Sequence, residues 1–135
     1  MTAVSTASAP LARPLHRTLW VLQAFLGTFL IVASAGPKLV GEANAVQTFE
    51  DMGAATWFRW FIGLVELAGG VGLLVPRLAG PAAVGLALLM VGAAVTQAVI
   101  LHGGALVLTP VVLFALFVFI AWGRRASIAR LVRRS

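Results

Sequence analysis

Four long apolar runs constrain this chain more than any other feature of its sequence. Each run has 18 to 20 residues, the length that an α-helix needs to cross the hydrocarbon core of a bilayer. The runs cover residues 19–36, 57–75, 82–101 and 105–122. Short breaks rich in proline and glycine separate the last three runs, so these helices should be antiparallel neighbours. The pattern predicts an all-α fold: a transmembrane four-helix bundle over residues 18–123.

The composition supports a chain dissolved in lipid. Of 135 residues, 61% are hydrophobic and only 10% are charged, whereas a soluble domain carries about 25% charged residues. The net charge of +6 is concentrated at the chain ends and in one loop, which indicates membrane topology and no nucleic-acid partner. There is no cysteine, which excludes thiolate catalysis and cysteine-based metal sites in this chain alone.

The positions of lysine and arginine predict the orientation of the bundle. With both termini cytoplasmic (N-in/C-in), only Lys38 and Arg59 lie outside, whereas eight arginines lie inside, as the positive-inside rule requires. The inside set is Arg13, Arg17, Arg77, Arg124, Arg125, Arg130, Arg133 and Arg134. Two tryptophans fall near each end of the spans, where an aromatic belt would place them. We therefore expect a multi-pass protein of the plasma (inner) membrane.

The segments outside the spans have different characters. Residues 1–17 are small, polar and proline-containing, which predicts a flexible cytoplasmic tail. Residues 124–135 form a basic cytoplasmic tail that we expect to lie on anionic lipid headgroups. A second interpretation treats the first run and Ala33-Ser34-Ala35 as a cleavable signal peptide. The length of the run and Pro37 close behind the cut disfavour it.

The connection over residues 38–56 is long enough to hold structure of its own. Val46, Phe49 and Met52 recur at helical spacing, with polar residues between them. This spacing predicts a short amphipathic outer segment between helices 1 and 2, lying on the membrane interface. An ordered loop with scattered apolar contacts is the alternative.

Small residues in the spans indicate where helices meet, because close backbone approach drives helix association in lipid. The second run carries Gly63, Gly69, Gly70 and Gly72, and the third carries Gly85, Gly92, Ala93 and Ala94. Both sets predict surfaces that face the bundle. Pro110 lies inside the fourth run, where it should leave the carbonyl of Leu106 without a donor and kink the helix.

Glu66 is the most informative single residue. It lies nine residues beyond Trp57, about 13 Å into a hydrocarbon core roughly 30 Å thick. An acidic side chain at that depth is costly and usually faces the bundle interior. Three roles are open: an ion pair with Lys38 or Arg59, a protonated carboxyl bonded to a neighbouring helix, or part of a ligand or proton site.

Two polar residues of the third run extend this picture. Thr96 and Gln97 lie in its outer half and could complete an outward-facing polar patch. The candidate ligand-binding residues are therefore Glu66, Lys38, Arg59, Gln97 and Thr96. An interhelical hydrogen bond is the plainer role for Gln97. Gln23, in the inner half of the first run, is expected to be structural.

No complete catalytic or redox centre is visible in the chain, so enzymatic activity is left undecided. The two histidines, His16 and His102, fall on opposite membrane faces and cannot ligate one haem together. The sequence has no metal-ligand spacing, phosphate-binding glycine loop or nucleophile–base pair. We expect no intrinsic cofactor.

Several segments in order resemble the DoxX-like family of small four-helix membrane proteins. They are Ala35-Gly36-Pro37-Lys38-Leu39, the stretch from Gly63 through Glu66 and Gly70 to Pro76, and Met90-Val-Gly92-Ala93 followed by Thr96. The resemblance implies a link to quinone-dependent redox assemblies and carries Lys38 and Glu66 over as candidate functional residues. Many relatives have His after the Thr of the third helix, where this chain has Gln97.

Three functions follow from these observations. The first is an accessory subunit of a membrane redox system, in which quinone is the ligand and a partner protein carries the electrons. The second is a membrane scaffold without a small ligand. The third is a small proton-coupled transporter using Glu66, which the one-sided arginine distribution disfavours because many such transporters insert in both orientations. A homo-oligomer is compatible with each.

Overall fold

The computed structural model describes residues 13–134, and it is helical throughout that range apart from short connections. Its elements are α1 (Arg13–Phe29), η2 (Leu30–Ala35), α2 (Gly36–Val40), α3 (Ala43–Asp51), α4 (Thr56–Leu74), α5 (Ala79–Val95), η3 (Thr96–Ile100), η4 (Gly104–Val107), α6 (Leu108–Gly123) and α7 (Arg125–Arg134). Of these, η2 and η3 are π-helical and η4 is a 3-10 turn.

Four continuous helical stretches are long and apolar enough to cross a membrane. They are Arg13–Val40, Thr56–Leu74, Ala79–Ile100 and Gly104–Gly123. The predicted all-α, four-span bundle is therefore confirmed.

The first span is longer than the sequence predicts at both ends. Residues 13–17, assigned to the flexible tail, are helical, while the rest of that tail lies outside the described residues. Pro37 does not end the helix, which continues to Val40. The turn before it is π-helical, with the Gly36 N–H donating to the carbonyl of Ile31. The backbone hydrogen bonds are therefore already of the π type just before Pro37. For this reason the N–H that proline lacks does not end the helix.

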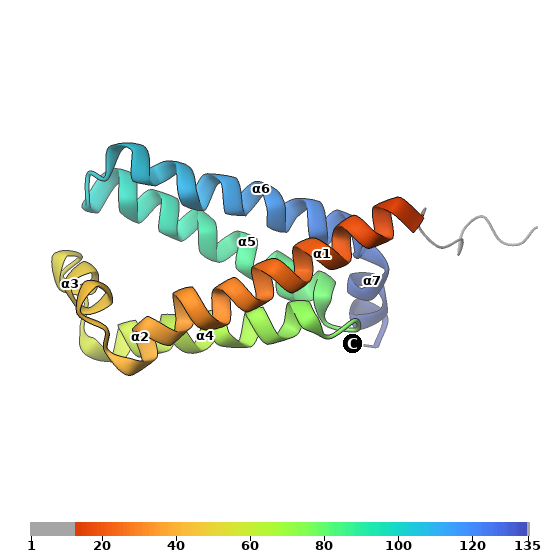
Figure 1. Ribbon diagram of the computed structural model, residues 1–135, viewed down its shortest axis with the longest axis horizontal. Coiled ribbons are helices and arrows are strands. Elements are labelled where there is room, and N and C mark those ends of the chain that lie inside the picture. Colours follow the sequence, from red (N-terminus) through yellow and green to blue (C-terminus); the bar gives the residue numbers. More distant parts are fainter. Residues whose placement is uncertain (1–12, 135) are drawn as a thin grey trace, which may run out of the picture.

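The spans are arranged as two helix pairs, α1 with α4 and α5 with α6. The pairs converge at the end where α7 lies and separate toward α3 (Figure 1); we call these the α7 end and the α3 end. The main core includes Leu26, Leu73, Leu86 and Phe117, all 1% exposed or less. This core holds the pairs together over the half of the bundle nearest α7.

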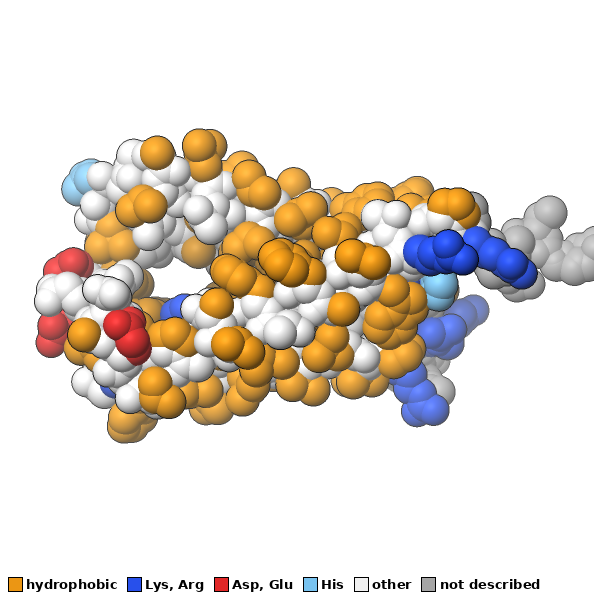
Figure 2. Space-filling view, in the orientation of Figure 1, with side chains coloured by type: hydrophobic (Ala, Val, Ile, Leu, Met, Phe, Trp, Pro, Cys, Tyr) orange, Lys and Arg blue, Asp and Glu red, His pale blue; other side chains and the backbone are white. Residues whose placement is uncertain are grey.

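Charge is segregated between the two ends (Figure 2). The acidic residues of α3 and its flanks cover one end, while arginines gather at the other, where α1 begins and α7 lies. Exposed apolar side chains such as Phe25, Val32, Leu88 and Val112 cover the surface between them. Charged ends and an apolar middle are the surfaces expected of a bundle whose middle faces lipid.

The glycines of α4 contact neighbouring helices as predicted, whereas Gly85 and Gly92 of α5 make no helix contact. A Cβ on Gly70 would lie 2.9 Å from the carbonyl oxygen of Gly27, and one on Gly72 would lie 2.8 Å from the Cβ of Ala82. Gly85 and Gly92 are exposed, and nothing lies within 4 Å of either position. Buried Ala83 and Ala87, with larger side chains, supply that packing instead.

Pro110 falls in a different context from the one predicted. It lies in the first turn of α6, directly after the 3-10 turn η4. An α-helix has free N–H groups in its first turn, so a missing donor costs little there. The proline therefore marks a change of helix type at the start of α6.

The two segments outside the spans are both helical. The connection between the first two spans contains α3, which begins with the Glu42 carboxylate accepting from the Ala45 N–H at 3.2 Å. This confirms the predicted short helix. The basic C-terminal segment forms α7, whose Ser127 hydroxyl accepts from the Gly80 N–H of α5 at 3.0 Å. The described part of that tail is thus docked on the bundle.

Candidate functional site

A cavity of about 620 Å³ lies between the two helix pairs near the α3 end. Figure 2 shows the opening between the pairs on that side of the molecule. Most of its wall is apolar or aromatic, with Phe29, Phe49 and Phe58 among the lining side chains. The polar residues on its wall are Ser34, Lys38, Thr48, Glu66, Thr96, Gln97 and Thr109. We call this space the α3-end cavity.

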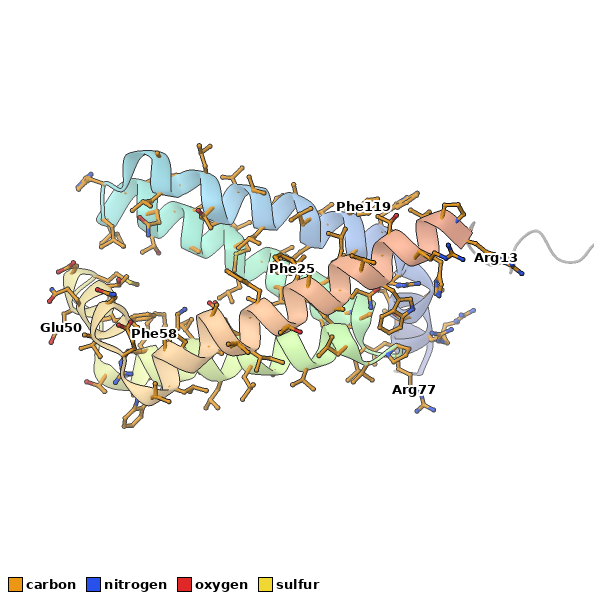
Figure 3. All side chains as sticks on the ribbon, in the orientation of Figure 1. Arg13, Phe25, Glu50, Phe58, Arg77 and Phe119 are labelled. Atoms are coloured by element: carbon orange, nitrogen blue, oxygen red, sulfur yellow. The ribbon has the colours of Figure 1, made fainter. Side chains whose placement is uncertain are left out.

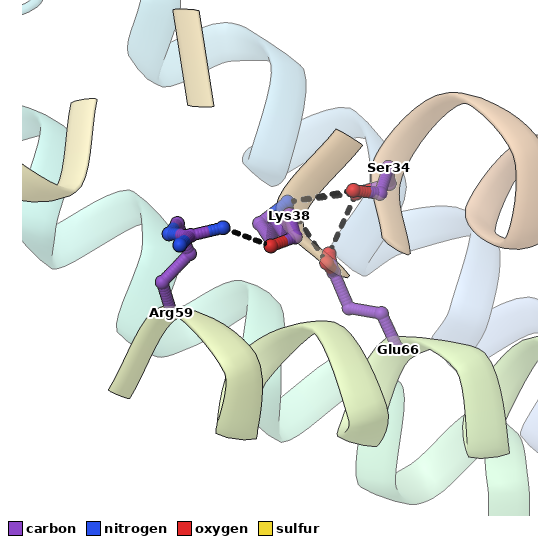
Figure 4. A network of polar contacts seen from close by, with 4 residues as sticks. All are labelled: Ser34, Lys38, Arg59 and Glu66. Carbon is purple, nitrogen blue, oxygen red and sulfur yellow. Dashed lines mark hydrogen bonds and ion pairs between the residues drawn. The ribbon is translucent and has the colours of Figure 1, made fainter. Parts of the chain in front are cut away.

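Lys38 and Glu66 form an ion pair on one wall of this cavity (Figure 4). The Lys38 ammonium lies 2.8 Å from Glu66 Oε1, and the two side chains are 19% and 6% exposed. The Ser34 hydroxyl donates to Glu66 Oε2 at 2.8 Å. The ammonium also donates to the carbonyl and hydroxyl oxygens of Ser34, at 3.3 and 3.1 Å. Both charges are therefore neutralised within the protein.

Local sequence explains why these three residues meet. Ser34 and Lys38 are four residues apart, so they share one face of the first span. Gly63 lies one turn before Glu66 on α4, and a Cβ there would lie 3.1 Å from the Lys38 Cβ and 3.0 Å from the Leu39 side chain. A larger residue would push α2 away. The glycine thus permits the close approach that puts the lysine within reach of the carboxylate.

Arg59 lies outside the polar patch predicted from the sequence. It is 7% exposed, but it neither lines the cavity nor pairs with Glu66. Its guanidinium donates to the backbone carbonyl of Lys38 (Figure 4). A cation is favourable at the last carbonyls of a helix, so Arg59 stabilises the end of α2 and thereby holds Lys38 in position.

Thr96 and Gln97 line the opposite wall, on the π-helical segment η3. The Thr96 hydroxyl donates to the carbonyl of Gly92 at 2.8 Å. Gln97 Oε1 is buried and has no hydrogen-bond partner among the described residues. Neither side chain bonds to Glu66, so the predicted patch is divided between two walls that face one cavity.

Sequence reasoning missed Ser34 and the aromatic lining. The signal for Ser34 was its position one helical turn before Lys38, but Ala33-Ser34-Ala35 was considered only as a cleavage motif. Phe49 was assigned to the membrane interface, yet it is 7% exposed and packs on Phe58, with ring centroids 6.1 Å apart. The helix α3 therefore turns its apolar face to the cavity.

A second polar cluster lies at the α7 end, and its residues are not among those that line the α3-end cavity. Gln23 donates to the carbonyl of Leu73 at 2.8 Å and accepts from Arg124 Nε at 2.6 Å. Arg124 also contacts His16 Nδ1 at 3.0 Å and lies over the Trp20 ring. Burial lowers the pKa of the Arg124 guanidinium. This cluster ties α1, α4 and the end of α6 together, in keeping with the structural role expected for Gln23.

Metal binding has no support among the described residues. No group of three histidine, aspartate or glutamate side chains is placed to hold an ion there. His16 lies on α1 at the α7 end, whereas His102 lies in the connection between η3 and η4, with a φ of 50°.

The fold and the cavity define a class: a small four-span helical membrane protein with a partly buried Lys–Glu pair beside an interhelical cavity. The family model for the DoxX-like family matches residues 21–120. The chain belongs to the DoxX-like family. The matched range includes both walls of the α3-end cavity. No curated protein and no solved structure gives a significant match to the chain.

Proposed function

We propose that this DoxX-like protein binds the head of a quinone in the α3-end cavity and acts as an accessory subunit of a membrane redox system. The observation that carries the proposal is the neutral, ion-paired wall of an otherwise mostly apolar cavity. The ion pair of Lys38 and Glu66 leaves no net charge on this wall for an ionic metabolite to neutralise. An uncharged head with polar atoms suits such a wall better.

The lining chemistry suits a ring with carbonyl oxygens. The Lys38 ammonium and the Ser34 hydroxyl carry donors that can turn toward a ligand oxygen, at the cost of the Lys38–Ser34 and Ser34–Glu66 hydrogen bonds. Phe29, Phe49 and Phe58 offer aromatic faces and edges to a flat ring. Small-molecule sites usually combine an apolar pocket with a few polar groups that fix the orientation of the ligand.

Two π-helical segments support a ligand site at this place. They are η2, which carries Ser34, and η3, which carries Thr96 and Gln97. π-helical turns are rare, and they occur frequently at functional sites because they redirect side chains locally. Both of those in the described chain contribute polar residues to the α3-end cavity.

A partner protein is part of the proposal because the chain has no cysteine and the described residues hold no metal-ligand cluster. Electron transfer to or from the bound quinone would then need a redox centre in another subunit. The role of this chain would be to bind and orient the quinone head and to exclude water from it.

Quinone binding by the purified full-length protein in lipid nanodiscs tests this proposal. We expect saturable binding by the wild type and at least a tenfold weaker binding by Glu66→Gln and by Lys38→Met. Glu50→Gln is the matched control, because Glu50 is an exposed carboxylate on α3 outside the cavity lining. Absence of saturable binding by the wild type contradicts the quinone proposal and leaves the scaffold and transporter roles.

We also propose that the α7 end faces the cytoplasm across the plasma membrane, on the strength of the arginines gathered there. The chain has no cysteine, so single cysteines report accessibility cleanly. A membrane-impermeant maleimide added to intact cells should label Asn44→Cys and should label Ala129→Cys only after lysis. Labelling of Ala129→Cys in intact cells means that the orientation is reversed.

A further inference from the structure

A groove of about 550 Å³ runs along one face of the first span. It is lined by Ala24, Phe25, Thr28, Phe29, Val32 and Ala33. All six are exposed, and five of them are apolar. Its lining spans ten residues, from Ala24 to Ala33, and the nine helical steps between them give the groove a length of about 14 Å.

The groove and the α3-end cavity share Phe29. This side chain is 37% exposed and stacks on Phe25, with ring centroids 6.4 Å apart. Figure 3 shows Phe25 at the edge of α1 nearest α5 in this view, where the two helix pairs begin to separate. Phe29 thus borders both the cavity and the groove on the exposed apolar surface of the first span.

We infer that the cavity is filled sideways from the bilayer, and that the ligand is a long-tailed quinone whose chain lies in the α1 groove. This inference rests on the proposed function and adds the class of ligand and its route. The polar head would reach Lys38 and Ser34 from the membrane side, past Phe29. The tail would remain on Ala24, Phe25 and Thr28, where apolar contact replaces contact with lipid.

Groove-filling variants separate the tail from the head. Thr28→Trp and Ala24→Trp place a large ring in the groove at exposed positions, outside the cavity lining. Val71→Trp is the control, because Val71 is an exposed apolar residue on α4 that lines neither space. Each protein in nanodiscs is titrated with two probes: a tail-free methoxylated benzoquinone and its decyl-tailed analogue.

The quantity to compare is the ratio of dissociation constants, variant over wild type, for each probe. Partition of a probe into lipid cancels in this ratio, so it reports contacts with the protein alone. We expect the ratio to rise about tenfold for the decyl probe with Thr28→Trp or Ala24→Trp, to stay near one for the tail-free probe, and to stay near one for both with Val71→Trp.

Any other result contradicts either the tail site or the proposed function. A ratio that stays near one for the decyl probe contradicts the groove as the tail site, while binding of both probes still supports the proposed function. An equal rise for both probes also contradicts it, since the substitution then acts on the head. If the wild type binds neither probe, the proposed function itself fails.

Discussion

The two ends of the bundle use buried polar groups in opposite ways. At the α7 end, Gln23 and Arg124 bond directly across helices, and the helix pairs close over them. At the α3 end, Lys38 and Glu66 also bond across helices, but their pair borders a cavity. The comparison distinguishes polar groups that only join helices from polar groups that also line a cavity where another molecule could bind.

A related contrast separates glycines that face another helix from a glycine that faces the cavity. Near the α7 end, Gly27 and Gly70 bring α1 and α4 into direct contact. Toward the α3 end, Gly92 lines the cavity and has open space around it. A glycine in a membrane helix is thus a sign of packing only where a second helix occupies the space beside it.

The largest expected effect comes from breaking the ion pair. Lys38→Met leaves the Glu66 carboxylate buried without its cation, which should lower the free energy of unfolding by about 3–5 kcal/mol. The double variant Lys38→Met/Glu66→Gln should recover most of this loss, because no uncompensated charge remains. Unfolding in mixed micelles by denaturing detergent measures both, with Glu50→Gln as the unaffected control. A Lys38→Met protein as stable as the wild type would show that the pair does not form.

A middle-sized effect should distinguish the two glycine positions. Gly70→Ala places a methyl group 2.9 Å from the Gly27 carbonyl oxygen, and the backbone shift that follows should cost about 1–3 kcal/mol. Gly92→Ala meets open space and should leave stability unchanged or raise it by up to about 1 kcal/mol, because alanine favours the helix. Thermal unfolding of the two variants beside the wild type is the measurement. Equal losses would mean that both halves are packed alike.

The smallest expected effect compares the two glutamines. Gln23→Leu removes one partner each from Arg124 and the Leu73 carbonyl and should cost about 1–2 kcal/mol. Gln97→Leu breaks no side-chain bond that the described residues show, so its cost should stay within about 0.5 kcal/mol. The same detergent titration reports both. A larger loss for Gln97→Leu would mean that its amide joins helices as Gln23 does.

The helical spans and the inward position of Glu66 could be predicted because lipid imposes them. Apolar length fixes the number of spans, and the cost of a charge at mid-depth fixes the face of Glu66. The partner of Glu66 could not be chosen between Lys38 and Arg59. Lys38 reaches Glu66 only because the first span continues past Pro37. A proline at that position predicts the end of a helix, so the sequence did not indicate this continuation. The cavity depends on how far the two helix pairs separate, and no local pattern encodes that distance.

The π-helical segment η2 has a consequence for comparing this chain with its relatives. Such a turn holds one residue more than an α-helical turn, so the helix after it keeps the direction that an uninterrupted α-helix one residue shorter would have. A relative with a one-residue gap within residues 30–35 would therefore present the lysine on the same side with a plain α-helix. A relative of equal length without the π-helical turn would rotate that lysine by about 100° relative to Glu66. The length and the helix type of that short stretch together would then tell which family members can form the pair with Glu66.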